Sequence, residues 1–118
     1  MSTLTISNLS DGTKTVATTF VTNGSAKAWA ANAIHSNQAT QDSFNQSSYT
    51  DTGSGRADIS FTNSMDSAIY SVVCGAAAGQ YPYQGYGIDA TKYRLSTVNS
   101  SANFSDGRNN GAVFGDLA

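Results

Sequence analysis

The stretch SFNQSSYTDTGSGRADISFT (residues 43–62) decides the fold class, because it carries the signals of a β-hairpin. In RADISFT (56–62) apolar and polar residues alternate, which is the period of a strand with one buried face. SFNQSSYT before it is a weaker partner strand, with Phe44 and Tyr49 on opposite faces. The DTGSG centre (51–55) supplies residues that tolerate positive φ and suits a short hairpin loop. No Lys follows its last Gly and a strand comes next, so it does not resemble a phosphate-binding P-loop.

The composition extends this prediction to the whole chain. Its 118 residues are enough for one domain, and they include no Glu and many Ser, Thr, Asn and Gly. Such residues favour turns and strands over long helices. We therefore predict an all-β fold, a small antiparallel β-sandwich of jelly-roll-like type formed by residues 26–118, with an extended N-terminal arm at residues 1–25.

Further strands are expected along the sandwich. The segment IYSVVCGAAA (69–78) is apolar on both faces and predicts a central strand, with Cys74 as a buried, inert thiol. Trp29 is the only tryptophan, and we expect its ring in the core; the alternative is an exposed platform on which a sugar could stack. YRLSTV (93–98) alternates, and AVF (112–114) predicts a last short strand.

The arm differs in pattern from the rest of the chain. LTISNL alternates and ends at the turn signal Ser10-Asp11-Gly12, and a Thr- and Val-rich run then leads to Asn23-Gly24. Its few apolar anchors cannot form a core alone, so we expect it to dock on a partner or to exchange between subunits. The alternative is that it supplies the first two strands of the domain. The candidate docking residues are Leu4, Ile6, Leu9, Val16 and Phe20.

The segment GQYPYQGYGID (79–89) contains three tyrosines, three glycines and the only proline, and predicts a loop in which the Tyr81–Pro82 bond could be cis. Tyrosine offers a flat apolar face and a polar tip, with little rotamer entropy to lose on binding. The candidate receptor or glycan contacts are therefore Tyr81, Tyr83 and Tyr86. Packing within the domain or at a subunit interface is the alternative.

The charges and the reactive residues exclude several functions. The net charge is −2 and the Lys and Arg residues are scattered, so nucleic-acid binding is not expected. No apolar run approaches the ~20 residues of a membrane span, and no secretory signal opens the chain. One His (His35) and one Cys predict no metal site, cofactor or catalytic residue. A glycosidase-type Asp pair stays open, because separation in space is not visible in a sequence.

The order of the residues resembles a repeat-like domain of tail-fibre and other virion-surface proteins of marine and cyanobacterial tailed phages. The resemblance touches most of the chain and is strongest over residues 24–73. It departs after Trp29, in the tyrosine-rich segment and at the end of the chain, and the family offers no catalytic residues to carry over. The matching residues are Lys27, Ala28, Trp29, Ser43, Phe44, Asn45, Ser47, Ser48, Asp51, Gly53, Gly55, Phe61, Thr62, Met65, Ala68 and Tyr70.

This resemblance implies a non-enzymatic structural protein on the surface of a phage virion, forming a homotrimer and contacting other capsid or tail proteins. A capsid decoration or head-fibre subunit would dock through the arm. A tail-fibre subunit would present residues 79–89 to a host receptor or glycan. A chain that begins at Met1 without a long shaft favours the small add-on subunit. The alternatives from other classes are a stand-alone carbohydrate-binding module, monomeric and dependent on the three tyrosines, and a small hydrolase using His35.

Overall fold

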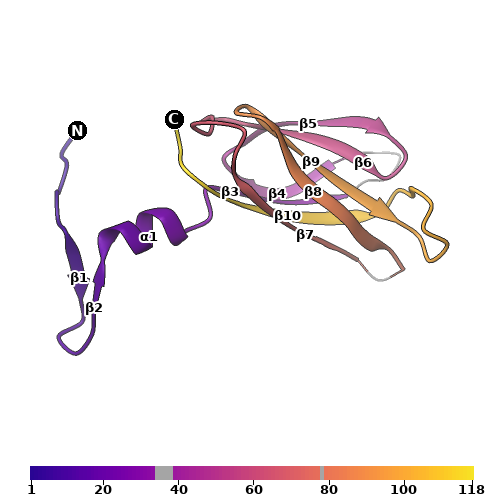
Figure 1. Ribbon diagram of the computed structural model, residues 1–118. Coiled ribbons are helices and arrows are strands. Elements are labelled where there is room, and N and C mark those ends of the chain that lie inside the picture. The colour runs from indigo at the N-terminus through magenta and orange to yellow at the C-terminus, as the bar shows by residue number, and fades with distance from the viewer. Residues whose placement is uncertain (34–38, 78) are drawn as a thin grey trace.

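The predicted hairpin is present as β5 (Gln46–Gly53) and β6 (Arg56–Phe61), which pair antiparallel (Figure 1). The loop between them is reduced to Ser54 and Gly55, with Gly55 at φ +65°. The alternation is confirmed, because Ala57, Ile59 and Phe61 are all buried. The first residues of the stretch belong elsewhere, since Phe44 ends the preceding strand.

The computed structural model describes residues 1–33, 39–77 and 79–118, and the expected all-β sandwich is confirmed (Figure 1). Every pair of neighbouring strands is antiparallel. Sheet I has the strand order β4 (Ala39–Phe44), β3 (Ala28–Ala33), β10 (Arg108–Phe114) and β7 (Ser71–Ala76). Sheet II has the order β5, β6, β9 (Lys92–Val98) and β8 (Tyr81–Asp89). The arm contains β1 (Asn8–Ser10), β2 (Thr15–Ala17) and the helix α1 (Thr18–Gly24).

The core lies between the inner faces of the two sheets. Phe61 stacks on Tyr93 with ring centroids 5.3 Å apart and meets Tyr70 edge-on at 5.7 Å. Such aromatic pairs add to the free energy gained from burial alone. The buried residues of this cluster are Ala28, Ala57, Ile59, Phe61, Met65, Tyr93, Leu95 and Val113. Strands β6 and β9 of sheet II contribute most of the large residues of the cluster, and strands β3 and β10 of sheet I contribute smaller ones opposite them. This arrangement lets the two layers approach closely.

Two predictions about sheet I are wrong, and both concern the same surface. Trp29 is 40% exposed, because its neighbours Ala28 and Ala30 fill the inner positions of β3 and alternation sends the indole outward. β7 is an edge strand and not a central one, and Val73 on its outer side is 59% exposed. Cys74, on the inner side, is only partly buried, and burial raises its pKa.

Candidate functional site

The arm begins with a short hairpin that places Leu9 opposite Val16. Its turn is held by Asp11, whose carboxylate accepts hydrogen bonds from the backbone N–H groups of Lys14 and Thr13, each at 2.8 Å. These bonds favour the charged carboxylate and lower the pKa of Asp11. The hairpin turn therefore lies where the turn signal of residues 10–12 predicted it.

The helix α1 follows directly, where the sequence predicted only an extended run. Thr18 fixes the start of the helix through two hydrogen bonds. The Thr18 backbone N–H donates to the carbonyl oxygen of Ser7 at 2.9 Å, and the Thr18 hydroxyl donates to the carbonyl oxygen of Ile6 at 3.0 Å. Helices shorter than about 12–15 residues are marginal in water by themselves. α1 has seven residues and buries none of them. The arm thus has secondary structure but no core of its own.

The five apolar residues expected to dock are all exposed. Their exposed fractions run from 39% at Val16 to 82% at Leu4, and Phe20 on the helix reaches 74%. Val21, also on α1, is 44% exposed and was missed by the sequence reasoning, although it follows Phe20 directly. Figure 1 shows the arm extending away from the sandwich. It therefore presents apolar side chains that its own sandwich does not cover.

The three tyrosines lie in strand β8, so the loop predicted for residues 79–89 is wrong. β8 pairs with β9 through two irregularities, near residues 82–84 and 87–89, and such bulges accommodate a Pro- and Gly-rich sequence at a sheet edge. The described peptide bonds, that of Tyr81–Pro82 among them, are trans. Tyr81, Tyr83 and Tyr86 are 55%, 58% and 39% exposed. They thus remain available for contact, on a strand instead of a loop.

Tyr83 belongs to a cluster that the sequence did not reveal. Its ring meets Phe104 edge-on with centroids 5.4 Å apart, and the guanidinium carbon of Arg56 lies 4.8 Å from the Phe104 centroid. Phe104 is 41% exposed and stands alone among Ser, Asn and Asp residues, which is the only sequence signal for it. We call Tyr83, Phe104 and Arg56 the aromatic cluster. Exposed rings beside a cation suit a ligand with both apolar faces and polar groups.

Tyr86 stands apart from the aromatic cluster, beside an ion pair. It is in register with Arg94, which in turn pairs with Asp58 on β6. Arg94 donates from Nε and Nη2 to the two carboxylate oxygens of Asp58, at 2.5 and 2.9 Å. This bidentate contact is the main cause of the raised pKa of Arg94. Arg94 is thus already engaged, and Arg56 is the cation that accompanies the exposed rings.

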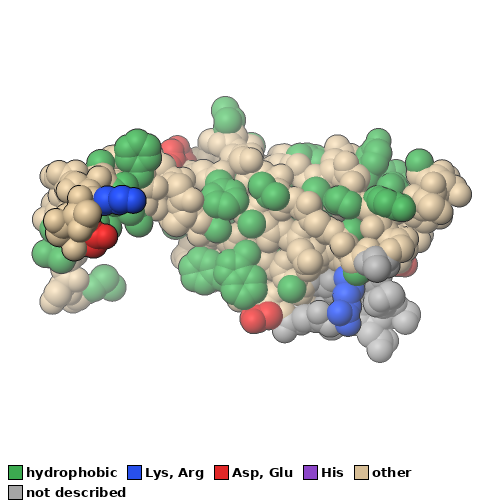
Figure 2. Space-filling view, turned by 90° about the horizontal axis from the view of Figure 1, so that it is seen from below, with side chains coloured by type: hydrophobic (Ala, Val, Ile, Leu, Met, Phe, Trp, Pro, Cys, Tyr) green, Lys and Arg blue, Asp and Glu red, His purple; other side chains and the backbone are tan. Residues whose placement is uncertain are grey.

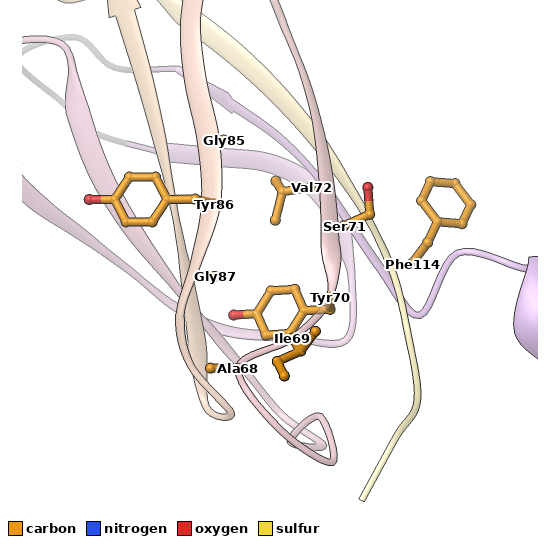
Figure 3. Close-up of a pocket in the computed structure, with 9 residues that line it drawn as sticks. All are labelled: Ala68, Ile69, Tyr70, Ser71, Val72, Gly85, Tyr86, Gly87 and Phe114. Carbon is orange, nitrogen blue, oxygen red and sulfur yellow. The ribbon is translucent and has the colours of Figure 1, made fainter.

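A groove of about 760 Å³ lies where the edges of the two sheets meet, between β7 and β8 (Figure 3). Figure 3 shows Tyr70 and Val72 between these strands, with Tyr86 on one outer side and Phe114 on the other. The Tyr70 hydroxyl lies 2.6 Å from the carbonyl oxygen of Lys92, and burial raises the pKa of Tyr70 to about 12. The Tyr70 hydroxyl is therefore engaged with the main chain of sheet II and ties the start of β7 to it.

Three comparisons bear on the identity of the chain, and none of them supplies a relative. Neither the protein-family models, nor the curated proteins, nor the solved structures contain a match. Across residues 1–33, 39–77 and 79–118 no cluster of three His, Cys, Asp or Glu side chains is placed to hold a metal ion. In the same residues no helix is long and apolar enough to cross a membrane. His35 lies outside the described residues.

Proposed function

We propose that the chain is a non-enzymatic structural subunit on the surface of a phage particle, of the capsid decoration, head-fibre or tail-fibre type. It attaches to other particle proteins through residues 1–25 and turns the sandwich outward. The observation that carries this proposal is the arm, which exposes apolar side chains and buries none in its own helix. The resemblance of residues 24–73 to phage virion-surface domains supplies the kind of assembly.

Physical chemistry favours a bound state for the arm. A two-stranded hairpin and a one-to-two-turn helix are each marginally stable when isolated in water. Contact with a partner would bury Leu4 and Phe20, the most exposed large side chains of the arm after Met1. Burying one such side chain fully contributes about 1.5–3 kcal/mol. Two or three of them therefore suffice for stable attachment once several copies act together.

Removing residues 2–22 is expected to abolish incorporation into particles while the sandwich still melts cooperatively. The copy number of the chain in purified particles, measured by quantitative mass spectrometry against the major shell protein, checks the first part, and near-UV circular dichroism checks the second. A matched pair of point variants refines the test. Phe20→Asp, at a 74% exposed position in the arm, should lower incorporation about tenfold or more, whereas Ile69→Asp, at a 91% exposed position in the sandwich, should not.

Two results would contradict this proposal. One is full incorporation of the truncated chain, which would place the attachment surface in the sandwich. The other is absence of the intact chain from particles, which would leave the carbohydrate-binding module as the better account. A copy number near that of the shell protein would identify a capsid decoration subunit, and a small multiple of three would identify a tail or fibre subunit.

The aromatic cluster favours host-surface glycan as the outward ligand, on a virion subunit and on a stand-alone module alike. Tyr83→Ala should weaken binding of the full chain to a glycan array about tenfold. The substitution removes one exposed ring and also the edge contact that holds the ring of Phe104 in place. Tyr81→Ala serves as the control, since Tyr81 is similarly exposed but has no ring contact among the described residues. Equal losses in the two variants, or none in either, would show that the cluster is not the contact.

A further inference from the structure

A row of apolar side chains runs across the outer face of sheet I. Register aligns Phe44, Trp29, Ala112 and Val73 side by side on the four strands. The three large side chains of this row are 55%, 40% and 59% exposed, in the order Phe44, Trp29, Val73. Figure 2, which views this side of the molecule, shows hydrophobic side chains gathered on it. We call this surface the sheet I face.

The two sheets differ sharply in charge. The strands of sheet I contain two charged residues, Asp42 and Arg108. The strands of sheet II contain six, namely Asp51, Arg56, Asp58, Asp89, Lys92 and Arg94. A sandwich that meets water on both sides would carry polar residues on both outer faces. Sheet II has this pattern, whereas the outer face of sheet I carries an apolar row beside a few polar side chains, Asp42, Asn110 and Arg108 among them.

The chemistry of the sheet I face identifies the kind of partner. A shallow groove of about 420 Å³ crosses it, lined by Trp29, Val73 and several Ala and Gly residues, with Asn110 as the polar side chain. A glycan would require several hydrogen-bonding groups around the indole, and a polyanion would require clustered cations. A flat surface with few charges, on which large apolar side chains stand among small residues, instead fits another protein surface of the same character.

We propose that the sheet I face is the contact between copies of this chain. The occupant is the sheet I face of a second copy, which deepens the proposed function by giving the surface on which the particle subunit self-associates. Asp42 and Arg108, both exposed, give each copy one charge of each sign, so like faces can meet without net repulsion. A patch that is complementary to itself pairs two copies about a two-fold axis, so this contact predicts a dimer and not the homotrimer that the resemblance implies.

The size of the face agrees with a self-contact that includes the arm. Four strands about 4.8 Å apart and about six residues long, at about 3.3 Å each, cover about 400 Å². Stable interfaces bury about 800 Å² per partner. α1 ends at Gly24 and three residues separate it from β3 in sheet I, so the arms of associated copies emerge beside this face. Contacts along the arms can therefore supply the remaining area.

Val73→Lys tests the inference on the purified full chain, by sedimentation velocity over a wide range of concentrations. The intact chain should form a discrete oligomer, and Val73→Lys should weaken self-association about tenfold or more, because a buried unpaired charge is costly at an interface. Val73 is on an edge strand and 59% exposed, so melting of the variant should change little. Thr50→Lys, at an exposed position on sheet II, is the control and should associate like the intact chain.

A monomeric intact chain at every concentration would overturn the inference, and so would unchanged association of Val73→Lys. Loss of association on removing residues 2–22, with Val73→Lys unaffected, would assign self-contact to the arm and would equally overturn it. These outcomes are separate from the proposed function, because attachment is read from purified particles and association from the isolated protein. A subunit can thus fail one test and pass the other.

Discussion

Replacing Gly55 with alanine is expected to lower the free energy of unfolding by about 2–5 kcal/mol, the sum of a backbone and a packing cost. Gly55 has φ +65°, where an L-residue is strained. A Cβ at this position would lie 2.4 Å from the carbonyl oxygen of Thr97 and 2.6 Å from the backbone nitrogen of Ser105. These are main-chain atoms, which cannot turn aside as a flexible side chain would.

The same position holds the hairpin turn to the rest of the sandwich. The Gly55 N–H donates to the carboxylate of Asp106 at 2.7 Å, and its carbonyl oxygen accepts from the Thr97 N–H at 2.7 Å. Gly79→Ala is the matched control, because Gly79 has φ +85° but open space around it. It should show the backbone cost alone, about 1–2 kcal/mol. Equal losses in the two variants, measured by urea unfolding, would contradict the role assigned to the packing at Gly55.

The strands with a strict alternation were predictable from the sequence. Ala57, Ile59 and Phe61 lie two residues apart between polar neighbours, and a period of two leaves one arrangement in which all three are buried. The hairpin turn was predictable for a related reason, since few residues other than Gly adopt the φ of Gly55. Local geometry fixes both features, so no knowledge of the rest of the chain is required.

Features that depend on distant partners were not predictable. Trp29 looked like a core residue because it is large and apolar, but Ala28 and Ala30 take the inner positions of β3, and Ala28 belongs to the buried cluster that includes Tyr93 and Leu95. The direction of its side chain therefore depends on residues more than sixty positions away. The aromatic cluster was hidden in the same way, because Arg56 and Phe104 meet only once β6 and the segment after β9 are folded. Single-sequence patterns carry no information on such pairings.

The two exposed outer faces suggest a division of roles within one small domain. Sheet II is charged and holds the aromatic cluster, as suits a surface turned toward solvent and host. Sheet I is nearly uncharged and continues into the arm, as suits a surface turned toward copies of the chain and toward the particle. A charged substitution is therefore expected to weaken self-association when it lies on sheet I and to leave it unchanged when it lies on sheet II.

Replacing Asn45 with alanine is expected to cost about 2–4 kcal/mol of unfolding free energy, from a strained backbone and unpaired polar groups. Asn45 joins β4 to β5, and so sheet I to sheet II, at φ +56°. Its amide nitrogen donates to the carbonyl oxygens of Lys27 and Asn63, each at 3.0 Å. Its amide oxygen accepts from the Asn63 N–H at 2.7 Å.

Two further substitutions at Asn45 separate these causes, because each keeps part of what alanine removes. Asn45→Gly keeps the positive φ without strain but loses all three bonds, and Asn45→Asp keeps only the acceptor for the Asn63 N–H. Both should unfold at urea concentrations between those of the intact chain and of Asn45→Ala. A loss below about 0.5 kcal/mol in Asn45→Ala, the range of neutral surface changes, would show that the corner does not depend on this side chain. Because Phe44 directly precedes it on the sheet I face, a loosened corner should also weaken self-association, by a route that Val73→Lys does not share.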